Sequence, residues 1–185
     1  MKKQPERTAK TRARLIEAFW TVGETHGLSH VSVSGVAKSA GVNRSTFYVY
    51  FDDIPSLLRE AEQEIISEIK QRLWSQLAIP EKIDSQQFTA RAVAVFEQYG
   101  DRLFFLLGEH GDPNFSRKLR QEALETLPNL LPDTSALQDQ EYVLAFLSAA
   151  FIGVLQYWHE GGRKISVEAL SKIVQRLGVN AIRNW

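Results

Sequence analysis

The stretch GVNRSTFYVYF, residues 41–51, has a composition that fits neither a core segment nor an ordinary surface segment. Its eleven positions hold one cation, two aliphatic hydroxyls and four aromatic rings. A core segment does not scatter hydroxyls among its rings, and a solvent-facing segment does not carry so many rings. The mixture indicates a short helix that packs one side against a core and presents its other side to a polar partner.

The residues around this stretch complete a helix-turn-helix pattern. Ser32 is predicted to cap a short helix that ends before Gly41, and Asn43 to cap a second that ends near Tyr50. Glycine accepts the positive φ that the short turn between them needs. Two short helices joined by such a turn form a helix-turn-helix. The residues predicted to face the core are Val36, Ala37, Ala40, Val42, Phe47 and Phe51.

The other side of the second short helix offers groups that suit the major groove of DNA and its phosphate walls. Ser45, Thr46 and the phenol of Tyr48 can donate hydrogen bonds to phosphate oxygens. Arg44, near the helix start, can reach O6 and N7 of guanine. The pattern therefore predicts a DNA-binding helix.

The charge is divided unevenly along a chain that is neutral overall. Residues 1–51 carry eight Lys or Arg against three Asp or Glu, a net charge of +5, so residues 52–185 carry −5. A basic end favours a polyanion as the partner of that end, although a solvated basic tail has the same composition. Lys10, Arg12 and Arg14 are predicted to neutralise the DNA backbone beside the motif.

The rest of the chain also reads as helix, and no segment alternates convincingly enough for a strand. Further helices are predicted at about 8–26, 53–78, 85–99, 101–110, 112–127, 138–159 and 166–183, with connecting segments at 79–85 and 128–137. The predicted fold class is therefore all-α. A three-helix helix-turn-helix domain is expected at 1–52, with its motif at about 32–51, and a second helical domain at 53–185.

The composition argues against catalysis and metal binding. The absence of cysteine excludes disulfides and thiolate metal sites, and only four histidines are present. His110 with Asp112, and His159 with Glu160, are the alternatives for acid–base or metal chemistry. No nucleophile motif or phosphate-binding glycine loop accompanies them. We predict no enzyme activity, no cofactor and no metal site.

The N-terminus is charged and lacks the apolar run of a secretory signal. The longest apolar stretch, 143–158, falls short of the roughly 20 residues that span a bilayer, so it is interpreted as a buried helix. We therefore expect a cytoplasmic protein with no membrane partner.

The stretch from about Thr11 to Leu58 resembles the DNA-binding domain of TetR-family transcriptional regulators. The segments Ser32-Val33, VAKSAGVN, RSTFYVYF and IPSLL follow the pattern of that family in order. Three residues depart from it: Gly35 replaces a better helix former, Asn43 replaces the usual serine cap, and Ile54 replaces a lysine that commonly grips phosphate. The resemblance implies DNA contacts from Ser32, Ser34, Arg44, Ser45, Thr46, Tyr48, Val49 and Tyr50.

The same resemblance implies a sequence-specific regulator of transcription. The expected form is a homodimeric repressor that binds a palindromic operator in double-stranded DNA and is released by a small-molecule effector. The alternative is an activator, or a co-regulator of the same fold that binds a protein partner. The second domain is accordingly expected to bind the effector and to dimerise.

Two sets of residues in the second domain are candidates for these roles. Small and apolar residues on the last two helices predict a dimer interface, with an intramolecular core as the alternative: Ala145, Ser148, Ala149, Ile152, Gly153, Ile173 and Leu177. Aromatic residues and one histidine predict an apolar ligand pocket. These are Phe96, Phe104, Phe105, His110, Phe115, Tyr142, Phe146 and Trp158. The alternative for the aromatic residues is core packing, and the alternatives for His110 are capping of a helix C-terminus and exposure to solvent.

Overall fold

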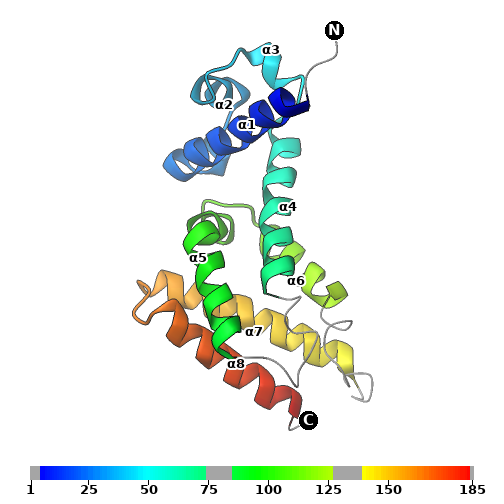
Figure 1. Ribbon diagram of the computed structural model, residues 1–185, viewed down its shortest axis with the longest axis vertical. Coiled ribbons are helices and arrows are strands. Elements are labelled where there is room, and N and C mark those ends of the chain that lie inside the picture. The colour runs from blue at the N-terminus through cyan, green and yellow to red at the C-terminus, as the bar shows by residue number, and fades with distance from the viewer. Residues whose placement is uncertain (1–4, 74–84, 127–138, 184–185) are drawn as a thin grey trace. The chain divides into compact units, whose positions relative to one another are not determined.

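The computed structural model describes residues 5–73, 85–126 and 139–183, and every regular element in these ranges is a helix (Figure 1). The prediction of an all-α fold is confirmed. The helices are α1 (Pro5–His26), η1 (Leu28–His30), α2 (Val33–Ser39), α3 (Arg44–Phe47), α4 (Ile54–Arg72), α5 (Ser85–Leu107), α6 (Phe115–Thr126), α7 (Gln140–Glu160) and α8 (Val167–Arg183).

Two compact units divide the chain. The first comprises Met1–Glu64 together with Glu109–Asp112, and the second comprises Ile65–Gly108 together with Pro113–Trp185. The division falls inside α4, whereas the sequence-based boundary at 52–53 lies just before that helix. The four residues that follow Gly108 belong to the first unit although they are far from it in sequence.

The core of the first unit forms because each of its helices carries an apolar face at helical spacing. Leu15 and Phe19 of α1 repeat four positions apart and are fully buried. Each of the other helices α2, α3 and α4 adds a fully buried residue, namely Val36, Phe47 and Leu57. The predicted core residues Ala37, Ala40 and Phe51 are also buried. The helix-turn-helix motif is therefore supported by a buried apolar core.

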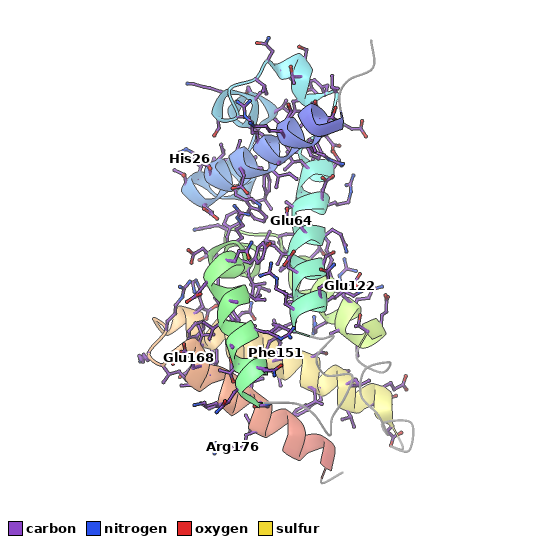
Figure 2. All side chains as sticks on the ribbon, in the orientation of Figure 1. His26, Glu64, Glu122, Phe151, Glu168 and Arg176 are labelled. Carbon is purple, nitrogen blue, oxygen red and sulfur yellow. The ribbon has the colours of Figure 1, made fainter. Side chains whose placement is uncertain are left out.

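One core cluster of the second unit is built by α5, α7 and α8. Phe104, Leu155, Trp158 and Leu170 form one buried cluster, and Phe151 of α7, labelled in Figure 2, packs against it. Polar contacts tie the end of α4 into the same unit. Lys70 Nζ lies 2.7 Å from Glu122 Oε2 of α6, and Arg72 Nη1 donates to Gln98 Oε1 of α5 at 2.9 Å.

Helix α5 differs from the prediction of two helices separated near Gly100. A glycine inside a helix costs only about 1 kcal/mol relative to alanine. That cost is offset because the buried stripe of α5 continues unbroken through the glycine, at Ala92, Val95, Tyr99, Leu103 and Leu106. The prediction of a break was therefore wrong.

The other predicted helix ends agree to within a few residues. α6 begins at Phe115 and not at Asp112, because the carbonyl of Asn114 accepts the N–H of Lys118 at 3.0 Å. The predicted end of α4 near 78, the segment 79–84, the end of α6 at 127 and the loop at 128–137 lie outside the described residues.

Helix α7 is apolar over almost its whole length. Within the described ranges, Glu141–Glu160 is long and apolar enough to span a membrane by length and composition, contrary to the expectation from the 143–158 run. The core helix of a globular protein passes the same test, and Leu155 and Trp158 of α7 lie in the core. Only 33% of the apolar window in this stretch is buried, so α7 also has an apolar face that the described residues leave exposed.

Candidate nucleic-acid interface

The turn between α2 and α3 has the geometry that the sequence predicts. Ser32 is the N-cap of α2, and its Oγ accepts the backbone N–H of Gly35 at 3.2 Å. Gly41 adopts a φ of 63°, in the left-handed region that glycine enters without strain. The N–H of Gly41 donates to the carbonyl of Lys38 at 3.1 Å, which closes the end of α2.

Helix α3 is short, and its orientation is set by one buried ring. Phe47 is fully buried, so the opposite side of α3 faces outward. Helical geometry continues to Tyr48, whose φ and ψ are −67° and −6°. Of the predicted contact residues, Ser32, Ser34, Arg44, Ser45, Tyr48 and Val49 are exposed, and Thr46 and Tyr50 are half-buried.

Arg44 and Tyr48 contact each other on this exposed side. Arg44 Nη2 donates to the phenolic oxygen of Tyr48 at 3.2 Å, and the guanidinium carbon lies 5.8 Å from the centre of the tyrosine ring. Their spacing of four positions brings two side chains together on one face of a helix. The sequence therefore contained the signal for this pair, although the prediction gave the two residues separate roles.

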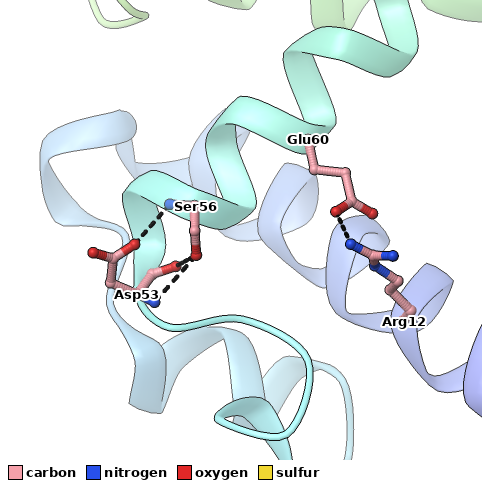
Figure 3. A network of polar contacts seen from close by, with 4 residues as sticks. All are labelled: Arg12, Asp53, Ser56 and Glu60. Carbon is pink, nitrogen blue, oxygen red and sulfur yellow. Dashed lines mark hydrogen bonds and ion pairs between the residues drawn. The ribbon is translucent and has the colours of Figure 1, made fainter.

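Two of the three cations expected beside the motif have partners inside the first unit. Arg12 forms an ion pair with Glu60 of α4 (Figure 3), and its guanidinium carbon lies 5.4 Å from the ring centre of Phe51. Arg14 donates to the carbonyl oxygen of Ala40, the C-cap of α2. These contacts brace the motif. Lys10 and Lys38 are exposed.

The start of α4 is capped by an acid. Asp53 Oδ1 accepts the N–H of Ser56 at 2.7 Å, and the N–H of Asp53 donates to Ser56 Oγ at 3.2 Å, as Figure 3 shows. This reciprocal arrangement satisfies orphan donors of the helix start. With Asp52 exposed beside it and Ile54 next, this end of α4 presents negative charge and no cation.

The second unit brings together three of the eight predicted ligand residues. The ring centres of Phe96, Phe104 and Trp158 lie 5.8 to 6.0 Å apart. All three belong to the apolar cluster of α5, α7 and α8. Among the described residues of the second unit they form one apolar, aromatic region, in which Phe104 and Trp158 are buried and Phe96 is half-buried.

The other five predicted ligand residues lie elsewhere. His110 is exposed and belongs to the first unit, where its side chain lies beside Gly27. Phe115 is fully buried at the start of α6, and Tyr142 and Phe146 of α7 are exposed. Phe105 is half-buried on α5. The sequence grouped these residues by type, and the fold separates them.

A polar cluster borders the aromatic region at the turn between α7 and α8. The ring of His159 stacks on Phe104 with centroids 4.1 Å apart, and its Nδ1 accepts the Nε–H of Arg163 at 3.2 Å. Arg163 Nη2 also lies 3.0 Å from Asp101 Oδ1 of α5. Partial burial lowers the pKa of His159, and Arg163 lowers it further against the opposing effects of Asp101 and Glu160.

The predicted dimer residues divide between an exposed and a buried group. Ala145, Ala149 and Gly153 of α7 are exposed, and so are Ile173 and Leu177 of α8. Ser148 and Ile152 are buried inside the protomer. The exposed face of α7 is more apolar than the predicted set suggests, because Phe146 and Tyr157 on it are 69% and 81% exposed.

Two family models match the chain. The model described as bacterial regulatory proteins of the tetR family matches residues 15–61, and the model of a transcriptional regulator C-terminal region matches residues 84–179. A comparison with curated protein sequences finds no match.

Solved structures of regulators share the fold over almost the whole chain. FadR of Bacillus halodurans, a fatty acid degradation regulator, is 21% identical over 96% of both chains, with a TM-score of 0.71. A TetR transcriptional regulator from Streptococcus agalactiae is 24% identical over 94% of this chain and 96% of its own, with a TM-score of 0.68. FadR of Bacillus subtilis, in complex with stearoyl-CoA, is 18% identical over 91% and 98%, with a TM-score of 0.70.

The helix-turn-helix unit followed by a helical second unit defines a DNA-binding regulator of transcription, and this is not the architecture of an enzyme. The chain belongs to the TetR family of bacterial transcriptional regulators.

Proposed function

We propose that this regulator is a homodimeric repressor that binds a palindromic operator and leaves it when a small molecule binds the second unit. The observation that carries the proposal is the exposed side of α3, where Arg44, Ser45 and Tyr48 stand on a fully buried Phe47. Such a helix meets the requirement for reading DNA, because its polar groups face outward from a rigid support.

The roles proposed at the interface follow from chemistry and position. Arg44 and Ser45 read base edges, since arginine donates two parallel hydrogen bonds to guanine O6 and N7. The hydroxyls of Thr46 and Tyr48 bind phosphate. The remaining contact residues in this proposal are Ser32 and Ser34 at the start of α2, and Val49 and Tyr50 after α3.

The proposed partner of the exposed apolar faces of α7 and α8 is a second copy of this chain. Exposed apolar residues of this size on one helix face mark an interaction surface. Ala145, Ala149 and Gly153 are small enough for a partner helix to approach closely. In a dimer that reads a palindrome, the two α3 helices lie about 34–36 Å apart, one turn of B-DNA.

The proposed effector is an apolar small molecule that binds at the aromatic region of Phe96, Phe104 and Trp158. An effector releases DNA only by its differential affinity for the DNA-bound and free conformations. Stearoyl-CoA is a suitable first test compound, because the FadR structure from Bacillus subtilis contains it. The protein is proposed to act in the cytoplasm, where the DNA is.

A selection from random DNA duplexes tests the proposal. The purified full-length protein should enrich a palindrome, and Arg44→Ala should lose the base preference at one position in each half-site while remaining a folded dimer. Enrichment of no sequence by the wild-type dimer, with or without candidate effectors, would overturn the repressor proposal.

One observation favours the alternative, a co-regulator that binds a protein partner. The start of α4 presents Asp52 and Asp53, and Ile54 stands where relatives commonly carry a phosphate-binding lysine. Weaker phosphate binding at this point suits a co-regulator, because a co-regulator is recruited by a second protein. The same selection separates the two, since a co-regulator enriches no palindrome by itself. An activator enriches one, and a reporter gene fused to the operator then gives the sign of regulation.

A further inference from the structure

Tyr48 contacts Arg44 in two ways, through its phenolic oxygen and through its aromatic ring. Its oxygen accepts a hydrogen bond from Arg44 Nη2 at 3.2 Å, and its ring lies under the guanidinium at 5.8 Å. Both side chains are exposed, Tyr48 by 49%, so this contact forms without burial to enforce it. It restricts an arginine side chain that otherwise samples many rotamers in water.

The ring of Tyr48 is itself held by the core. It meets the buried ring of Phe47 edge to face, with centroids 5.6 Å apart and an interplanar angle of 84°. Phe47 in turn lies 5.8 Å from the buried Phe51. A chain of ring contacts therefore runs from the core of the first unit to the guanidinium of Arg44.

The donor and acceptor inventory leaves both groups able to bind DNA. A guanidinium has five N–H donors, so Arg44 can donate one hydrogen bond to Tyr48 and still donate two parallel hydrogen bonds to guanine O6 and N7. A phenol has one O–H donor besides its acceptor lone pairs, so Tyr48 can donate to a phosphate while accepting from Arg44. The phosphate then polarises the same hydroxyl that holds the arginine.

We infer that Tyr48 is a specificity-determining positioning residue, which orients Arg44 for a guanine and couples that base contact to the phosphate backbone. The inference rests on the proposed DNA-binding function and deepens it. A tyrosine that only binds phosphate contributes equally to every sequence. A tyrosine that positions Arg44 contributes more when guanine is present.

The test measures a discrimination ratio between two DNA duplexes. One is the selected duplex, and in the other the preferred base pair is replaced. The ratio is the dissociation constant for the replaced duplex divided by that for the selected duplex. The replaced pair is the one whose preference Arg44→Ala relaxes. Fluorescence anisotropy on the full-length protein gives the ratio for wild type, Tyr48→Phe, Arg44→Ala and the double variant. Tyr48→Phe keeps the ring against Phe47 and removes only the hydroxyl. Tyr50→Phe is the matched control, because it removes a neighbouring phenol that is not the acceptor of Arg44.

The wild-type ratio is expected at about 5- to 150-fold. Tyr48→Phe should reduce it by about 2- to 12-fold, the effect of one hydrogen bond, and should leave the ratio of Arg44→Ala unchanged. Tyr50→Phe should weaken binding without changing the ratio. Equal weakening of both duplexes by Tyr48→Phe would overturn the inference and leave the proposed function intact. Selection of the same palindrome by Arg44→Ala would overturn the inference and the base-reading role proposed for Arg44, and leave the proposed repressor function intact. Failure of the wild-type protein to select any sequence would overturn both.

Discussion

The backbone N–H of Leu28 donates a hydrogen bond of 3.0 Å to the carbonyl oxygen of His110, which joins two segments far apart in sequence. Gly27 makes this possible, because its φ of 83° turns the chain after α1. The bond fixes the four residues 109–112 to the first unit, the unit that carries the helix-turn-helix. In the sequence these four residues lie between α5 and α6.

Gly27→Ala should therefore destabilise the protein by about 1–3 kcal/mol, the cost of a backbone conformation that only glycine adopts readily. Steric crowding is not the reason, since an added Cβ meets His110 Cβ at an ordinary 3.6 Å. Chemical unfolding of the full-length protein measures the change.

Gly100→Ala is the matched control with the opposite sign. An added Cβ at this position meets Phe96 at 3.7 Å, an ordinary contact, and the residue lies inside α5. The variant should be more stable by about 0.5–1 kcal/mol, the usual advantage of alanine in a helix. Destabilisation of both variants to a similar extent would show that the conformation of Gly27 is not the cause.

Ile54→Lys should strengthen DNA binding and steepen its dependence on salt. The substitution restores a cation at the start of α4, where Asp52 and the capping Asp53 now present negative charge. One added phosphate contact steepens the slope of log affinity against log salt by about 0.9 for each protomer. Titrations at several salt concentrations measure the slope.

The control for this variant is Ile54→Gln, which is polar but adds no charge. It should leave the salt slope unchanged. A slope that stays equal in wild type and Ile54→Lys would mean that the start of α4 does not approach phosphate.

Local signals in the sequence were sufficient to predict the helix-turn-helix motif. Contacts between residues far apart in the sequence could not be predicted from such signals. Ser32 and Gly41 indicate a cap and a turn through chemistry that acts within a few residues, and the structure has both. The placement of His110 depends on a hydrogen bond with Leu28, which lies 82 positions earlier in the sequence. No local pattern in the sequence encodes this contact. The sequence shows the charge of Arg12, which therefore predicts a contact with DNA. The sequence does not show that Glu60 lies beside Arg12 in the fold.

Gly153→Arg should convert the proposed dimer into a monomer with little effect on the fold. An added Cβ at Gly153 meets no heavy atom within 4 Å, so the isolated protomer accommodates a side chain there. A charged side chain at the centre of the proposed apolar interface would raise the dimer dissociation constant by at least about thirtyfold. Sedimentation equilibrium measures this constant.

Gln121→Arg on the exposed side of α6 adds the same charge away from the proposed interface and should leave the dimer intact. Because a dimer is needed to span a palindrome, Gly153→Arg should also lose affinity for the full operator more than for a half-site. A monomeric wild-type protein at micromolar concentration would contradict the prediction before any variant is made.

Partial burial of His159, together with the neighbouring charge of Arg163, predicts a loss of stability in mild acid. Nδ1 of His159 accepts the Nε–H of Arg163 at 3.2 Å, which requires the neutral ring. The folded-state pKa of His159 is lowered from 6.5, first by partial burial and then by Arg163, while Asp101 and Glu160 oppose the shift. The unfolded chain therefore binds more protons as the pH falls, and stability decreases below about pH 6.5. Above about pH 7.5 both states are neutral at this position, and the contribution is fully present.

His159→Gln separates this effect from the other histidines, because glutamine does not titrate and can still accept a hydrogen bond. Thermal unfolding between pH 5 and 8, at one protein concentration, should show wild type losing stability faster than the variant below about pH 6.5 and in parallel with it above pH 7.5. Arg163→Ala should weaken the acid dependence without abolishing it, because burial, the larger cause, remains. Parallel curves for wild type and His159→Gln throughout the range would show that His159 titrates alike in the folded and unfolded chain.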